Sequence, residues 1–193
     1  MNLFILVWSL ISPLCLGIVA SVFWSRPNNW HPASSEVGIS LLVYSAYWLL
    51  LGGLQAAALF WRFRDRRFAV RWFLVTSATG ILVMLLHDLT VFAITGALEG
   101  QGVLFLGISF SVLAVLGGLV LGAAQFLLIR QRDRVHSNLK VLRTQWFVLS
   151  WLSWVIGFAG IPFVFYSMFV SVFVTVAVGS ALKGWFLQKY LND

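Results

Sequence analysis

Six long apolar segments follow one another along this chain, and they constrain its fold more than any other feature. They lie at roughly 2–24, 36–61, 70–98, 103–129, 144–160 and 161–187. A helix rises about 1.5 Å per residue, so about 20 apolar residues cross the hydrocarbon core of a bilayer. Only 10% of the residues are charged, whereas soluble domains carry about 25%. The sequence therefore predicts an all-α integral membrane protein, in which residues 1–193 form one bundle of six transmembrane helices.

The thirteen basic residues are concentrated in alternate gaps between these segments. Five lie between Arg62 and Arg71, five lie between Arg130 and Arg143, and two more follow near the C-terminus. Arg26 alone falls in a gap of the other parity. With six spans, the basic gaps and both termini share one side, which the positive-inside rule makes cytoplasmic. We expect the inner (cytoplasmic) membrane or an equivalent internal membrane, with the lipid bilayer as partner and no nucleic acid.

A short phrase is written twice in the charged gaps, as RFRDRR at 62–67 and as RQRDRV at 130–135. Further matches surround it in the same order: GIS precedes each copy, GGLQ pairs with GAAQ, and Trp-Phe follows. We expect a parallel internal duplication of a helix hairpin, covering 36–87 and 105–160, with the sixth segment as a weaker third copy of its first half. The alternative is that small residues and basic ends recur independently in membrane helices.

Two adjacent ionisable residues, His87 and Asp88, lie within the third segment. Such side chains cost at least about 2.5 kcal/mol each at the bilayer centre, which makes them candidates for binding a substrate, proton or cofactor. The other interpretation is structural, at a helix end or a buried polar contact. Both residues can face one ligand only if the helix is interrupted between them, because neighbouring helical positions point in different directions. The sequence indicates no metal site and leaves any cofactor unknown.

Two glutamines, Gln55 and Gln125, occupy equivalent places before the two arginine clusters. An amide in lipid seeks a hydrogen-bond partner on another helix, and nearby glycines let backbones approach closely. We expect the glutamines either to hold helices together or to line a small polar site near a pseudo-twofold axis. Trp48 and Trp151 lie within the segments and are candidates for stacking on a flat ligand or for filling the core.

The arginine clusters have two interpretations. They fix the topology, or they also dock anionic lipid headgroups or an acidic partner, each basic residue contributing about 1 kcal/mol. The candidate docking residues are Arg62, Arg64, Arg66, Arg67, Arg130, Arg132 and Arg134. Asp65 and Asp133 are expected to brace neighbouring arginines. Aromatic residues at the segment boundaries, including Trp72 and Trp146, are expected to form a belt at headgroup level.

No catalytic signature is present, neither a metal-binding helix motif nor a nucleophile elbow nor a phosphate-binding loop. We therefore predict a non-catalytic accessory or assembly subunit of a larger membrane complex, with another membrane protein as partner. The alternative is a small transport component that captures an apolar or amphipathic molecule and is energised by a separate partner. In size and helix number the chain resembles the substrate-binding components of energy-coupling-factor importers, a resemblance that implies this alternative.

Overall fold

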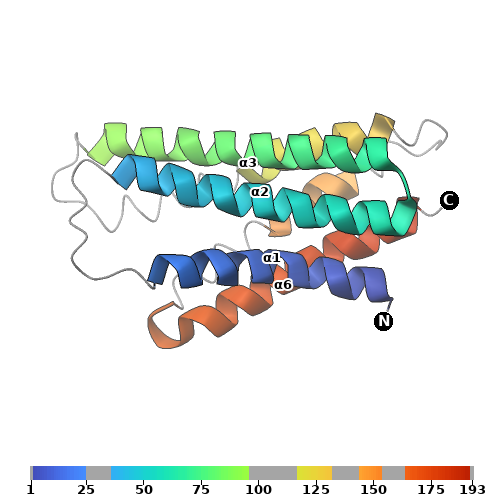
Figure 1. Cartoon of the computed structure of the whole chain (residues 1–193), viewed down its shortest axis with the longest axis horizontal. Helices are drawn as coiled ribbons and strands as arrows, with labels where there is room; N and C mark the ends of the chain where they lie inside the picture. Colours follow the sequence, from blue (N-terminus) through green and yellow to red (C-terminus); the bar gives the residue numbers. More distant parts are fainter. Residues whose placement is uncertain (1, 25–35, 96–116, 132–143, 154–163, 192–193) are drawn as a thin grey trace.

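The computed structural model describes residues 2–24, 36–95, 117–131, 144–153 and 164–191, and these residues form helices and no strand. Over these residues the predicted all-α architecture with six helices is confirmed. Four helices have defined bounds: α1 spans Leu3–Trp24, α2 spans Glu36–Phe63, α3 spans Arg66–Thr95 and α6 spans Val164–Leu191 (Figure 1). The other two are described as helix 117–131 and helix 144–153.

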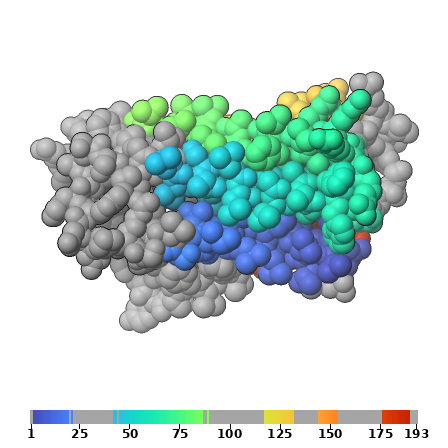
Figure 2. Space-filling model, viewed as in Figure 1, coloured from blue at the N-terminus to red at the C-terminus, as the bar shows by residue number. Residues whose placement is uncertain are grey.

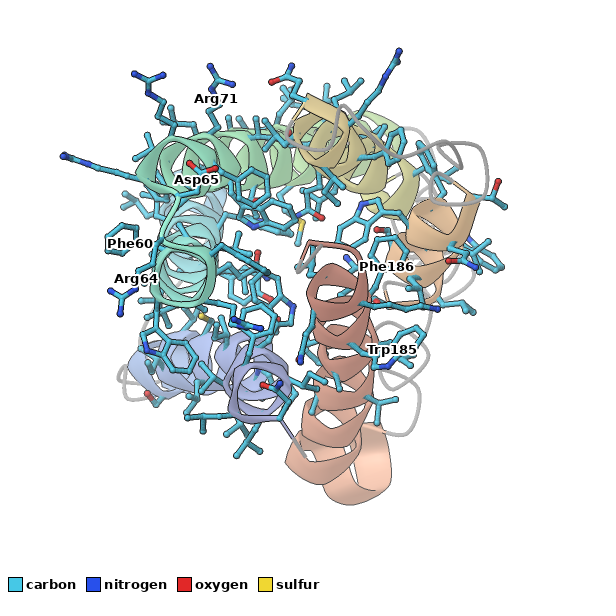
Figure 3. The ribbon with its side chains drawn as sticks, turned by 90° about the vertical axis from the view of Figure 1, so that its right-hand side faces the viewer. Phe60, Arg64, Asp65, Arg71, Trp185 and Phe186 are labelled. Atoms are coloured by element: carbon cyan, nitrogen blue, oxygen red, sulfur yellow. The ribbon has the colours of Figure 1, made fainter. Side chains whose placement is uncertain are left out.

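The helices form a closed ring in which each one lies beside its neighbour in the sequence. α2 packs against α3, α1 packs against α2, and α6 returns to pack against α1. Three hydrogen bonds join the remaining neighbours: Gln125 to Thr76, Trp146 to Gly122 and Ser153 to Gly179. The view along the bundle shows these helices arranged around a shared interior (Figure 3). On one side, α1, α2 and α3 make a continuous face (Figure 2).

The stretch RFRDRR forms a tight connection between α2 and α3. Arg64 has a left-handed backbone with φ of 56°, and its N–H donates to the carbonyl of Phe60 at 2.8 Å. The Asp65 carboxylate accepts a hydrogen bond from the N–H of Phe68 at 2.9 Å, the geometry of a helix N-cap. This turn, the start of α1 and the end of α6 lie at the same end of the bundle (Figure 1), which we call the arginine end. The aspartate in the repeated phrase therefore serves α3 as its cap.

Glycines allow the helices to approach where large side chains meet them. A Cβ atom at Gly80 would collide with the indole of Trp48, so this ring lies directly on the α3 backbone. A Cβ at Gly184 would lie 3.0 Å from atoms of Trp8, which places this side chain of α1 against the α6 backbone. Glycine at these positions brings the backbones close enough for each indole to contact main-chain atoms.

One helical segment within the described residues, Arg66–Leu86, is both long and apolar enough to cross a membrane. Leu3–Val19 is apolar but shorter. Only 28% of the most apolar window of Arg66–Leu86 is buried within the bundle. That the chain crosses a membrane stays a prediction from the sequence.

Candidate functional site

The interior of the ring contains a set of buried polar side chains contributed by all six helices. Its members are Ser12, Gln55, Thr76, Ser77, Gln125, Ser150, Ser180 and Lys183. Polar groups in an apolar interior cost free energy unless they are hydrogen-bonded, so their partners decide whether this set holds the helices together or binds a ligand.

Beside the polar set lies an aromatic cluster made of Trp8, Trp72, Trp146 and Phe186. Ring centroids are 5.9 Å apart between Trp8 and Trp72, 6.0 Å between Trp72 and Trp146, and 5.1 Å between Trp146 and Phe186. Trp72 and Trp146, the repeat-related tryptophans, are both 0% exposed. The expectation that these two residues join an aromatic belt is therefore wrong, because both rings point into the bundle and fill its centre.

Each tryptophan of the aromatic cluster is followed four residues later by a buried hydroxyl residue, namely Ser12, Thr76 and Ser150. Residues four apart lie on the same face of a helix. The hydroxyl residues thus lie one turn further from the arginine end than the indoles, on the same inward faces. Three helices that run in the same direction therefore present the same pair of side chains to the interior.

The two glutamines both hydrogen-bond to α3 and not to each other. The indole Nε1–H of Trp72 donates to Oε1 of Gln55 at 3.1 Å, and Nε2 of Gln125 donates to the hydroxyl of Thr76 at 3.0 Å. Gln55 reaches α3 from α2, and Gln125 reaches it from helix 117–131. Both contacts join adjacent helices, so the geometry corresponds to the helix-joining interpretation of this pair.

Lys183 is buried, 9% exposed, and its ammonium lies 5.8 Å from the centroid of the Trp146 ring. Among the described residues, no carboxylate forms an ion pair with it. Buried polar atoms without a hydrogen-bond partner in the described interior include Trp8 Nε1, Gln125 Oε1, Ser150 Oγ and Gln188 Oε1. The described interior therefore contains a buried cation, one N–H donor without an acceptor and three oxygens without a partner, and a small polar or amphipathic molecule could hydrogen-bond to these atoms.

Sequence reasoning did not select Lys183 or its neighbour Ser180, whose hydroxyl donates to that of Ser12 at 2.9 Å. The signal was nevertheless present. The stretch Ser180-Ala-Leu-Lys183 has the same spacing of a small and a polar residue as GGLQ and GAAQ. Lys183 thus occupies on α6 the position that glutamine occupies in the other two helices.

Trp48 and Trp151, two further candidate ligand residues, are not brought together by the fold. Trp48 is buried against Gly80, and its carbonyl accepts a hydrogen bond from the Ser77 hydroxyl at 3.0 Å. Trp151 is 37% exposed on the outside of the ring. His87 and Asp88 lie within α3, which continues unbroken to Thr95, while their side chains are outside the described residues.

The described arginines of the docking set gather at the arginine end, in exposed or half-buried positions: Arg62, Arg64, Arg66, Arg67 and Arg130. Arg71 lies beside them and donates to Oε1 of Gln131 at 3.4 Å, which ties α3 to helix 117–131. Arg64 and Arg71 point away from the bundle (Figure 3). Arg132, Asp133 and Arg134 are outside the described residues.

The described part of the chain contains no group of three His, Cys, Asp or Glu side chains placed to hold a metal ion. No protein-family model, no curated protein and no solved structure matches the chain. Its function is therefore inferred from its own geometry.

Proposed function

We propose that the chain is a six-span membrane protein that acts as a non-catalytic accessory or assembly subunit of a larger membrane complex. The observation that carries this proposal is the distribution of polarity across the bundle. Gln55 and Gln125 are buried, while large apolar residues such as Leu42, Leu74 and Leu89 are at least 56% exposed. Water would favour the opposite distribution, because exposed apolar area is unfavourable and buried amides must find partners. Hydrocarbon surrounding the ring removes this conflict.

The placement of charge supports an orientation with the arginine end in the cytoplasm. The arginines of the α2–α3 turn, Arg130 and Lys189 all belong to helix ends on this side of the bundle. Basic residues are retained on the cytoplasmic side of inner membranes during insertion. The proposed location is accordingly the inner membrane or an equivalent internal membrane.

The hydrogen bonds of the interior favour a subunit over a carrier. Gln55, Thr76, Gln125 and Ser180 each bond to a side chain on a neighbouring helix. Their polarity is thus used to fix helix positions, which leaves the lipid-facing surface and the arginine end as the surfaces for recognition. We propose another membrane protein as the partner.

Capture of a small amphipathic molecule is the second candidate, and the environment of Lys183 favours it. A molecule with an anionic group would pair with the ammonium, and its apolar part would contact the indoles of Trp8 and Trp146. A transport component with such a site would take its energy from a separate partner.

We propose further that the bundle is assembled from three related hairpins. Trp8, Trp72 and Trp146 begin corresponding inward faces, and a small residue followed by a polar one recurs in α2, helix 117–131 and α6. The third copy includes α1 and α6, which extends the duplication read from the arginine phrases.

Purification in mild detergent followed by mass spectrometry separates the two functions. A reproducible protein partner supports the subunit, whereas a small molecule that is lost on Lys183→Met supports capture. Reporter fusions near residues 65 and 133 test the topology, and reporters on opposite sides of the membrane would refute the six-span arrangement.

A further inference from the structure

A groove of about 340 Å³ runs along the outside of the ring between α2 and α3. Its lining includes the small residues Gly53, Ala56 and Ala57 of α2, together with the aromatic residues Phe60 and Phe73. Its volume is within the range of ligand pockets, roughly 300–1,000 Å³. Its lining residues come from both α2 and α3.

Two adjacent glycines show that this space is separate from the contact between the helices. A Cβ at Gly52 would collide with the hydroxyl of Ser77, so glycine at this position is required for the contact between α2 and α3. A Cβ at Gly53 would find its nearest neighbour, an atom of the Phe73 ring, only at 4.0 Å. Gly53 is thus not required for the contact between α2 and α3, and its missing side chain leaves the groove open.

The groove has a charged end and an apolar length. Arg66, an exposed residue in the first turn of α3, lines it at the arginine end. From Arg66 to Phe73 the groove follows two turns of helix, a length of about 10 Å at about 1.5 Å per residue. Such a site accommodates the upper part of an acyl chain, with its headgroup beside the guanidinium.

The charge around the opening selects the class of lipid. The described residues from 62 to 71 contain five arginines and one aspartate, and Asp65 is engaged as the cap of α3. A guanidinium binds phosphate oxygens through paired hydrogen bonds, and additional basic residues attract a net negative headgroup. A zwitterionic lipid carries no net charge and gains less from this surface.

We propose that this groove is a specific site for one anionic phospholipid, whose phosphate binds Arg66 and whose acyl chain lies over Gly53, Ala56 and Ala57. The site rests on the proposed membrane location of the chain. The proposed site includes Arg66 but not Arg64. Arg64 lies at the turn, points away from the bundle and does not line the groove (Figure 3).

Native mass spectrometry of the full chain in detergent tests the site, with phosphatidylglycerol and phosphatidylcholine of identical acyl chains added in equal amounts. We expect at least five-fold preferential retention of phosphatidylglycerol. Arg66→Gln should reduce that preference about five-fold, because about 1 kcal/mol is gained per basic residue near anionic lipid. Arg64→Gln, the matched control on the turn, should change it less than two-fold.

Filling the groove tests the acyl-chain contact separately. Gly53→Leu should reduce retention of both lipids, whereas Ala46→Leu, at an exposed α2 position outside the groove, should not. Equal retention of the two lipids by the wild-type chain, or undiminished retention by both Gly53→Leu and Arg66→Gln, would overturn the site. Extraction of the wild-type chain from membranes by alkaline carbonate would instead refute the membrane proposal on which the site rests.

Discussion

The hydrogen bond between Trp72 and Gln55 provides the sharpest test of how the ring is held together. Its donor residue is fully buried, its acceptor residue is nearly so, and the two atoms are 3.1 Å apart. Gln55→Leu replaces the amide with an apolar side chain of similar size and leaves the indole N–H without an acceptor. In an aqueous protein this would cost about 1–3 kcal/mol. Between membrane helices, measured couplings average about 0.6 kcal/mol and reach about 1.7 kcal/mol.

A double-mutant cycle of Gln55→Leu and Trp72→Phe isolates this term from the loss of ring area. The Trp72 ring also contacts Trp8, Phe68 and Trp146, so Trp72→Phe alone destabilises the chain through packing as well. We expect a coupling energy between about 0.6 and 1.7 kcal/mol. The assay is reversible unfolding in mixed micelles of a mild detergent and increasing fractions of a denaturing one.

The control cycle pairs Gln55→Leu with Trp146→Phe. The Nε1–H of Trp146 donates to the carbonyl of Gly122 and not to Gln55. Any coupling between Trp146 and Gln55 passes through the Trp72 ring, which contacts Trp146, and it should therefore be smaller than the coupling of the hydrogen-bonded pair. A Gln55–Trp72 coupling no larger than this control would show that the glutamine contributes no specific hydrogen bond to the bundle.

Three further changes have defined outcomes in the same unfolding assay. Asp65→Ala should destabilise the chain by about 1 kcal/mol because α3 loses its cap, whereas Arg64→Gly should stabilise it by up to about 1 kcal/mol because glycine adopts the left-handed conformation without strain; equal signs would contradict the turn geometry. Lys183→Met should stabilise the ligand-free chain by about 1 kcal/mol, the balance between the cost of burying a charged group and the gain from a cation–π contact. Loss of stability would show that Lys183 supports the fold. Gly80→Leu should prevent recovery of folded protein on gel filtration, because the new side chain would occupy the position of Trp48; a normal elution profile would contradict this contact.

The existence of the helices could be predicted because each apolar run is long. The prediction began the third helix at residue 70, whereas α3 begins at Arg66. Charged residues were assigned to the connection, but Asp65 caps the helix before them and the arginines extend into its first turn. Charge marks where a span leaves hydrocarbon, while capping determines where the helix begins.

The direction in which individual side chains face was harder to predict. A tryptophan near a helix end suits both a headgroup belt and a bundle interior, so the positions of Trp72 and Trp146 alone did not distinguish them. The hydroxyl residue one turn later carries the additional information, since Thr76 and Ser150 are buried on the same faces. Lys183, one of the two lysines near the C-terminus, was likewise attributed to topology, although its side chain points inward.

The helices that carry Trp8, Trp72 and Trp146 each pack on the helix that precedes them around the ring. These three pairs of helices differ in whether the indole N–H has a hydrogen-bond acceptor. Trp72 meets an amide on α2, Trp146 meets a backbone carbonyl on helix 117–131, and both indole N–H groups are satisfied. Trp8 packs on α6 at Gly184 with its N–H unsatisfied, and α6 carries lysine where the other two helices carry glutamine. The indole N–H is therefore satisfied in two pairs. The third pair is joined by the hydrogen bond from Ser180 to Ser12, but it leaves the Trp8 N–H without an acceptor on the pair of helices that carries the buried lysine. If the interior binds any molecule, the boundary between α1 and α6 is where its polar group would find unsatisfied partners.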